Sequence, residues 1–177
     1  MKFLKKQEKA EVIEHKEQRV AVLIDVQNMY HSAKNLYNSR VNFKNVLEAA
    51  KSSRKLIRAI AYGIETESGD EKKFFIALKN MGIDVKMKEL QIFPGGMKKG
   101  DWDVGIAVDA VKFSQYVDVI VLVTGDGDFI SLIEYLQNAT PVRVEIIAFD
   151  KSCSGKIKQI ADSFIDLGKN TKKYLLK

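Results

Sequence analysis

The hydrophobic positions of the chain alternate between two patterns from residue 20 onward. Continuous β-branched and aliphatic runs, typical of strands buried on both faces of a parallel sheet, are followed by segments with apolar residues at helical spacing. The runs predict strands at 20–24, 56–64, 83–93, 117–123 and 142–149, and a last edge strand at 164–167. The spacing predicts helices from the end of the first strand to residue 37, and at 43–50, 70–81, 102–113, 129–137 and 155–161.

Strands that alternate with helices predict an α/β fold. Right-handed crossovers place helices on both faces of a central, mostly parallel sheet, which gives three layers, α/β/α. At about 150 residues per domain, the 177 residues have room for one compact domain. We expect that domain at 20–168, with a charged N-terminal tail or marginal helix at 1–19 and a basic C-terminal tail at 169–177.

The composition excludes several classes of protein. A single cysteine, Cys153, cannot form an internal disulfide, and with only His15 and His31 beside it there is no Cys/His cluster for structural zinc. No apolar run approaches the roughly 18 residues of a membrane span, and residues 1–19 alternate lysine with glutamate where a signal peptide has an apolar centre. We therefore expect a cytoplasmic protein that binds no membrane.

Acidic residues directly follow two of the predicted strands. Asp25 ends the first strand, with Asn28 just after it, and Asp126 and Asp128 follow the strand at 117–123. If the sheet has the order 3-2-1-4-5, these strands are neighbours about 4.8 Å apart, and their terminal acids converge where such sheets bind ligands. The net charge of +6, from 29 basic and 23 acidic residues, favours an anionic partner such as nucleic acid.

A third acidic stretch opens the predicted helix at 102–113. Asp103, in its first turn, is expected at the same site, whereas Asp109 lies about 120° further around the helix and is expected to support the site or neighbouring helices by hydrogen bonding. Converging carboxylates repel one another unless a cation is present, and oxygen-only ligands suit Mg²⁺ or Mn²⁺. Such a metal promotes phosphodiester hydrolysis by lowering the pKa of the attacking water and stabilising the leaving oxygen. The sequence leaves open whether one ion or two bind.

Each of these residues also has a purely structural interpretation. Asp25 and Asp128 are placed to cap the helices that follow them, and Asp126 lies between two glycines, as a turn residue does. Asn28 is either an ordinary first-turn residue or a group that orients a phosphate or a water. Three acids at two adjacent strand ends, together with a fourth at a helix start, nevertheless favour a site.

These segments resemble the NYN domains, the LabA-like branch of the PIN-like nuclease superfamily. The matching segments are Asp25-Val26-Gln27-Asn28, Lys99-Gly100-Asp101-Trp102-Asp103-Val104, Thr124-Gly125-Asp126-Gly127-Asp128-Phe129 and Ala161-Asp162-Ser163-Phe164-Ile165-Asp166-Leu167, together with Asp109. The resemblance implies a PIN-like sheet of order 3-2-1-4-5 and a metal-dependent ribonuclease. It implies metal-binding and catalytic roles for Asp25, Asp103, Asp126 and Asp128, and supporting roles for Asn28 and Asp109.

Other residues near the expected site complete the prediction. We add Lys99, a base on the loop that carries Asp103, and Thr124, at the end of its strand, as substrate-binding or supporting residues. Gly105 stands where some relatives of the family carry another acid, which leaves the number of metal ligands open. Trp102 and Tyr30 would stack on a base if exposed, although Trp102 is expected in the core.

Two functions are carried forward. The first is a Mg²⁺- or Mn²⁺-dependent endoribonuclease that acts on single-stranded or structured RNA. The alternative is a non-catalytic RNA-binding or regulatory module that binds RNA through its lysines without cleaving it. A haloacid dehalogenase-like phosphatase is disfavoured because Gln27 stands two residues after Asp25, where that chemistry requires a second aspartate. The oligomeric state stays open between a monomer and a homodimer.

Overall fold

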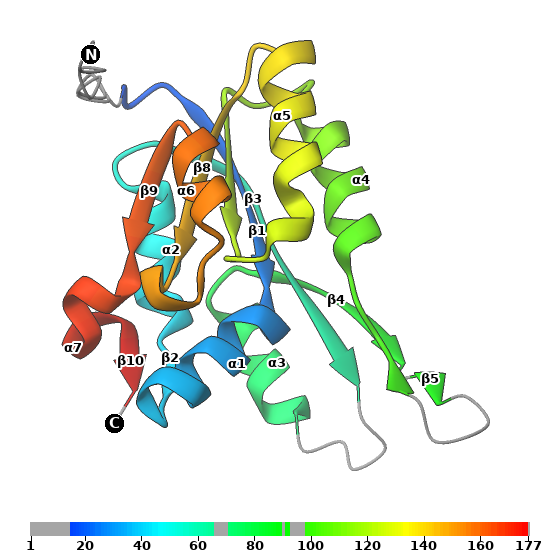
Figure 1. Ribbon diagram of the computed structural model, residues 1–177, viewed down its shortest axis with the longest axis vertical. Helices are drawn as coiled ribbons and strands as arrows, with labels where there is room; N and C mark the ends of the chain where they lie inside the picture. The colour runs from blue at the N-terminus through cyan, green and yellow to red at the C-terminus, as the bar shows by residue number, and fades with distance from the viewer. Residues whose placement is uncertain (1–14, 66–70, 90, 93–97, 177) are drawn as a thin grey trace, which may run out of the picture.

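Six parallel strands form the central sheet of the molecule (Figure 1). The computed structural model describes residues 15–65, 71–89, 91–92 and 98–176, without the side chains of 91–92 and 98–99. The strands, in their order across the sheet, are β4 (Asp84–Glu89), β3 (Lys55–Glu65), β1 (Arg19–Asp25), β7 (Val119–Val123), β8 (Arg143–Ala148) and β9 (Ser163–Asp166). Counted along the chain, this order is 3-2-1-4-5-6, which confirms the predicted order and places the expected last strand at the edge.

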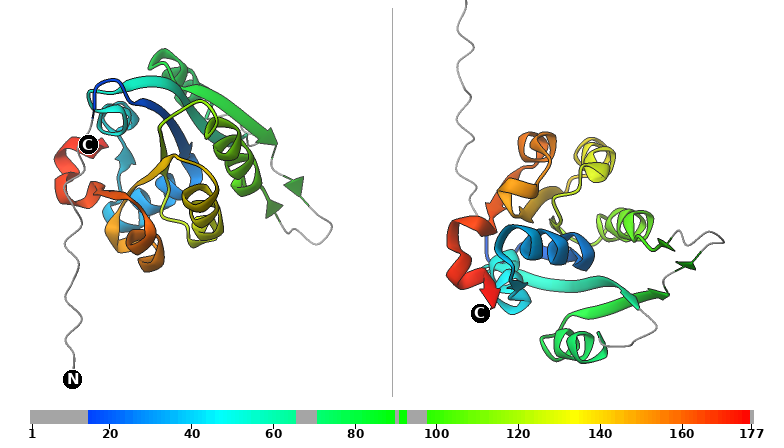
Figure 2. Two further views of the ribbon diagram at one scale, coloured as in Figure 1. Left: turned by 90° about the horizontal axis from the view of Figure 1, so that it is seen from above. Right: turned by 60° about the horizontal axis from the view of Figure 1, so that its bottom comes forward.

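Helices cover both faces of the sheet, as the three-layer prediction requires (Figure 2). The helices are α1 (Val26–Tyr37), α2 (Phe43–Lys51), α3 (Lys72–Asn80), α4 (Asp103–Phe113), α5 (Ile130–Ala139), α6 (Gly155–Ile160) and α7 (Thr171–Tyr174). Side chains alternate between the two faces of a strand, so Val22 and Ile24 pack on the side of α1, α2 and α3, whereas Ala21 and Leu23 pack on the side of α4, α5 and α6. Both faces of β1 are therefore buried, which explains its continuous apolar sequence.

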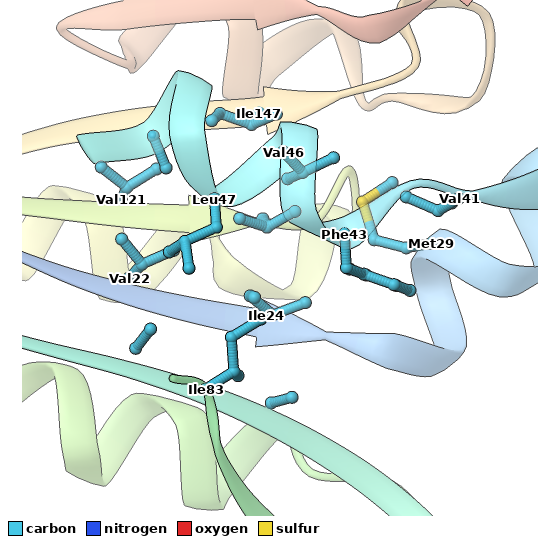
Figure 3. Close-up of a cluster of buried hydrophobic side chains, with 14 of the residues drawn as sticks. Val22, Ile24, Met29, Val41, Phe43, Val46, Leu47, Ile83, Val121 and Ile147 are labelled. Atoms are coloured by element: carbon cyan, nitrogen blue, oxygen red, sulfur yellow. The ribbon is translucent and has the colours of Figure 1, made fainter. Parts of the chain in front are cut away.

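The core under α1 and α2 fixes the position of the helix that starts at the end of β1. Met29 of α1 and Phe43 and Val46 of α2 are buried against Ile24 and Val121 of the sheet (Figure 3). Burial of each large apolar side chain contributes roughly 1.5–3 kcal/mol. This packing holds the first turn of α1 at the carboxyl end of β1.

The C-terminal segment, expected as a basic tail at 169–177, packs against the rest of the domain. Within it, α7 is followed by β10 (Leu175–Leu176), which pairs antiparallel with β2 (Arg40–Val41), and Tyr174 is only 8% exposed. The backbone N–H of Asn42 also donates to the carbonyl of Tyr174 at 2.8 Å. Lysines surround the short apolar stretch of this segment, so the sequence pattern did not predict that it packs. Its partners lie more than 100 residues away along the chain.

Two further predictions at the borders of the elements are refined. The strand expected at 83–93 is β4 followed by the short β5 (Gln91–Ile92), which pairs with β6 (Lys98–Lys99). The N-terminal tail or marginal helix expected at 1–19 falls mostly on residues 1–14, outside the described residues, and Arg19 is already the first residue of β1. Along the stretches that the structure describes, none of the helices has the length and apolar character needed to cross a lipid bilayer.

Candidate metal centre at the carboxyl ends of β1 and β7

A cavity of about 360 Å³ lies where β1 and β7 end, between α1 and the first turn of α4. The parallel pairing of β1 with β7, which sets Ile24 beside Val123, brings the loops after both strands to this edge (Figure 1). Four aspartates line the cavity: Asp25, Asp101, Asp103 and Asp126. The convergence predicted from the strand order therefore occurs.

Three of the four predicted metal ligands form one cluster. Asp103 begins α4, and Asp126 and Asp128 lie in the turn that follows β7. Each of the three offers a carboxylate oxygen, and these oxygens lie within 4.8 Å of one another. The turn after β7 closes as the 3-10 helix Gly127–Phe129, and it brings a carboxylate oxygen of both Asp126 and Asp128 into the group.

Asp25, the fourth predicted ligand, lines the same cavity but is not a member of this group of three. One of its oxygens accepts a hydrogen bond from the backbone N–H of Asn28 at 3.0 Å, and the other accepts one from the hydroxyl of Thr124 at 3.3 Å. Asp25 therefore does cap α1. Burial raises the pKa of Asp25, and the nearby Asp126 raises it further. A carboxylate has about four lone-pair positions, so the cap leaves acceptor capacity for a cation.

Asn28 and Thr124 hold the loop that carries Asp126. The side-chain oxygen of Asn28 accepts a hydrogen bond from the backbone N–H of Gly125 at 3.0 Å, which joins α1 to the end of β7. The buried hydroxyl oxygen of Thr124 accepts one from the backbone N–H of Asp126 at 3.2 Å. These contacts are those expected of residues that support the site rather than of metal ligands.

The electrostatics of the cluster fit a divalent cation. The pKa of Asp103 is raised to about 6, first by partial burial and then by the charges of its acidic neighbours, Asp101, Asp126, Asp25 and Asp128. The donors in the group are oxygens alone, which is the ligand chemistry of Mg²⁺ and Mn²⁺ rather than of zinc. A bound cation would offset the repulsion that raises the pKa of Asp103.

The raised pKa of Asp103 predicts how the stability of the metal-free protein depends on pH. The folded state holds the proton more tightly than the unfolded chain, whose value is about 3.9. The destabilising contribution of the Asp103 carboxylate therefore sets in as the pH rises above about 4 and is complete above about 6. In EDTA, Asp103→Asn should raise the melting temperature at pH 7.5 and raise it less at pH 4.5, as measured by circular dichroism. An equal rise in melting temperature at both pH values would contradict the raised pKa of Asp103.

The start of α4 is fastened to β3 by Trp102. Its indole N–H donates to the carbonyl of Gly63 at 2.7 Å, and the ring lies beside that of Tyr62, with centroids 5.3 Å apart. The ammonium group of Lys88 lies 4.3 Å from the centroid of the Trp102 ring and donates to the carbonyl of Asp101 at 3.0 Å. Trp102 is half-buried, so the prediction that it lies in the core holds only in part, and Lys88 covers the ring that was a candidate for stacking.

Asp109 supports α4 rather than the acidic cluster. Its side chain is buried, with 7% of the residue exposed, and accepts hydrogen bonds from the hydroxyl of Tyr62 and the ammonium of Lys86, both at 2.6 Å. Burial, followed by the bond to Asp109, raises the pKa of Tyr62, so the hydroxyl stays protonated. Asp109 thereby ties α4 to β3 and β4, in agreement with the hydrogen-bonding role expected for it.

Gly105 leaves room for the Trp102 ring. A Cβ atom at position 105 would lie 2.5 Å from a ring carbon of Trp102, much closer than real contacts allow. Gly105→Ala should therefore displace the ring and shift the fluorescence of Trp102, the single tryptophan of the chain. We also expect weaker Mn²⁺ binding, because Asp103 shares this turn.

Gly155→Ala is the matched control for Gly105→Ala, since a Cβ there meets nothing within 4 Å in the first turn of α6. Alanine in a helix is otherwise favoured over glycine by about 1 kcal/mol. Unchanged fluorescence in both variants would show that Trp102 does not lie on Gly105.

Other site residues were missed or lie at the border of the described structure. Lys99 lies in β6, and its side chain is outside the described part of the chain. Gln27, His31 and Asn35 of α1 line the cavity and were not predicted as site residues. Their spacing of four residues was the available signal, because it places them on one face of a helix that begins at Asp25.

The chain is similar to known proteins in sequence and in structure. The family model for the NYN domain matches residues 19–168. The chain belongs to the NYN domain family. NYN domains are part of the PIN-like nuclease superfamily, which confirms the resemblance noted in the sequence and places the chain among nuclease-type proteins.

Two relatives extend this assignment. The NYN chain is 27% identical over 157 residues to the Low amplitude and bright protein LabA of Synechococcus elongatus, covering 84% of this chain and 83% of that protein. It also superposes on the crystal structure of a protein of unknown function from Vibrio parahaemolyticus with a TM-score of 0.83 and 30% identity, over 93% of this chain and 100% of the other. The similarity in fold and the family membership therefore apply to nearly the whole domain.

Proposed function

We propose that this NYN domain is a metal-dependent endoribonuclease that hydrolyses the phosphodiester bonds of RNA. The observation that supports the proposal most strongly is the group formed by Asp103, Asp126 and Asp128, whose carboxylate oxygens lie within 4.8 Å of one another. Asp103 and Asp126 of this group line the cavity. Membership in the PIN-like superfamily supports a nuclease, and acids of this kind suit Mg²⁺ or Mn²⁺.

The roles of the residues follow from their positions. Asp103, Asp126 and Asp128 would hold the cation, with Asp25 available from the end of β1. When bound, a divalent cation lowers the pKa of an attacking water and stabilises charge on the leaving oxygen. Asn28 and Thr124 keep the loop of Asp126 in place through their bonds to the backbone N–H groups of Gly125 and Asp126.

The charges around the cavity make the cation necessary for binding the RNA phosphate as well as for hydrolysing it. The described lining of the cavity contains four aspartates and neither lysine nor arginine. A phosphate would be repelled there unless a cation balances the acids. Lys88 of β4 lies next to the cavity, because its ammonium group contacts Asp101 and Trp102, two residues of the lining. It is positioned to attract the RNA backbone toward the site.

Incubation of purified protein with labelled RNA and with DNA of the same sequence, with Mn²⁺ or with EDTA, tests the proposal. We expect RNA fragments with Mn²⁺, none with EDTA, and little cleavage of DNA. The competing possibility, a non-catalytic RNA-binding module, predicts salt-sensitive binding that is indifferent to EDTA and yields no fragments. It gains support from the structural use of Asp25 and Asp126, which cap a helix and a turn in addition to lining the cavity.

A further inference from the structure

A stripe of three polar residues on α1 forms another wall of the cavity. Gln27, His31 and Asn35 follow one another at intervals of four residues, so they lie on one face of the helix. All three line the same cavity as Asp25 and Asp103. The stripe starts beside the acidic cluster and extends along α1 for about 12 Å, at about 1.5 Å per residue.

In the described part of the chain, the hydrogen-bonding groups of the stripe are not used to hold the fold together, although the His31 ring lies edge-on to that of Tyr30, with centroids 5.4 Å apart. Within the residues that the structure describes, the side chains of Gln27, His31 and Asn35 form no hydrogen bond to another protein group. Their neighbours on α1 do form such bonds, because Asn28 binds Gly125 and Ser32 binds Ser152. Carboxamides and an imidazole all carry hydrogen-bond donors, and the carboxamides carry acceptors as well. The stripe therefore presents unused groups of both kinds to the cavity.

The charges of the cavity decide which part of a nucleotide could lie along the stripe. A phosphate is compatible only with the acidic end, where a cation would balance the aspartates, since no described lysine or arginine lines the cavity. The carboxamides of Gln27 and Asn35 carry no charge that would attract a phosphate, and the stripe complements the hydrogen-bonding edges of a base and the hydroxyls of a ribose. It is thus suited to the uncharged part of a nucleotide.

We propose that Gln27, His31 and Asn35 bind the nucleoside next to the scissile phosphodiester and give the enzyme a base preference. The proposal rests on the proposed function and narrows it to single-stranded RNA. A cavity of about 360 Å³ is at the small end of ligand sites, which suits one nucleotide. His31 and Asn35 are exposed, so the stripe is open to solvent, and a base can use its edges to bind there only when it is unpaired, because in a duplex those edges are bound to the partner strand.

Binding of the four free nucleosides tests the site without metal or turnover. Adenosine, guanosine, cytidine and uridine are titrated in EDTA, and the amide NMR signals of α1 are followed. We expect saturable shifts whose midpoints differ between the nucleosides. The triple variant Gln27→Ala/His31→Ala/Asn35→Ala should bind the preferred nucleoside at least fivefold more weakly, and its far-UV circular dichroism spectrum should be unchanged. Lys34→Ala, an exposed position of α1 that does not line the cavity, should bind as the wild type does.

The results separate this inference from the proposed function. One outcome is that the wild type binds a nucleoside, the triple variant does not, and the wild type cleaves no RNA with Mn²⁺. This outcome supports the nucleoside site and overturns the proposed endoribonuclease activity. Absence of nucleoside binding, or equal binding by the triple variant, overturns the site. If the wild type cleaves RNA, the triple variant should also change the base found next to the cut, and an unchanged preference overturns the inference while the endoribonuclease stands.

Discussion

Asp126→Asn should reduce Mn²⁺-stimulated cleavage of RNA by at least about 100-fold, because even the outer partners of metal ligands contribute 10- to 100-fold. The substitution removes one of the three clustered negative charges while keeping the shape of the side chain. The fold should survive, since the asparagine oxygen can still accept the hydrogen bond that Asp126 takes from the backbone N–H of Asp128 at 3.0 Å. We expect the free energy of unfolding to change by less than about 1 kcal/mol.

Initial cleavage rates measure the first effect, and a Mn²⁺ titration by isothermal calorimetry measures whether the cation is lost. Asp84→Asn is the matched control, because it makes the same charge change at an exposed residue of β4 that pairs with Arg58 at 2.7 Å. Its cleavage rate should stay within twofold of the wild type. Cleavage by Asp126→Asn at the wild-type rate would exclude the acidic cluster as the active site, and equal losses in both variants would point to overall charge instead.

Glu145→Gln should cost about 3–5 kcal/mol of unfolding free energy, the largest stability loss that we expect from a single substitution. Glu145 and Arg54 are almost fully buried, at 5% and 6% exposure, and the guanidinium donates to both carboxylate oxygens at 2.9 Å. Arg54 also donates to the carbonyls of Ala50 and Lys51, and so joins the end of α2 to β8. Neutralising the glutamate leaves a buried cation without its counter-charge.

Urea denaturation measures this loss, with Asp84→Asn again as the control. Breaking the exposed Arg58–Asp84 pair should cost no more than about 1 kcal/mol, because water screens that pair. The double variant Arg54→Met/Glu145→Leu should be more stable than either single variant, since it removes both buried charges. A loss below about 1 kcal/mol for Glu145→Gln would show that the pair is not buried in solution.

Local pattern was enough to predict most of the fold. The apolar run of β1 predicted a strand buried on both faces, and the helices followed from spacing, because burial on one face imposes a period that neighbouring residues share. The acids Asp25, Asp126 and Asp128 were found because parallel strands bring their carboxyl ends to one edge. The short β10 was missed because two strand residues carry no measurable period.

The sequence by itself determined the α/β class, the strand order expected for the family it resembles, and three of the four aspartates that line the cavity. It did not determine the fourth, Asp101. Only the tertiary structure decided how those acids are used: Asp103, Asp126 and Asp128 form the cluster, while Asp25 also caps α1 and Asp109 turns away toward Tyr62. The reason is physical, since periodicity records which face of an element is buried, whereas the partner of a side chain depends on residues brought together from distant positions. The pairing of Arg54 with Glu145, 91 residues apart, exists only in the folded chain.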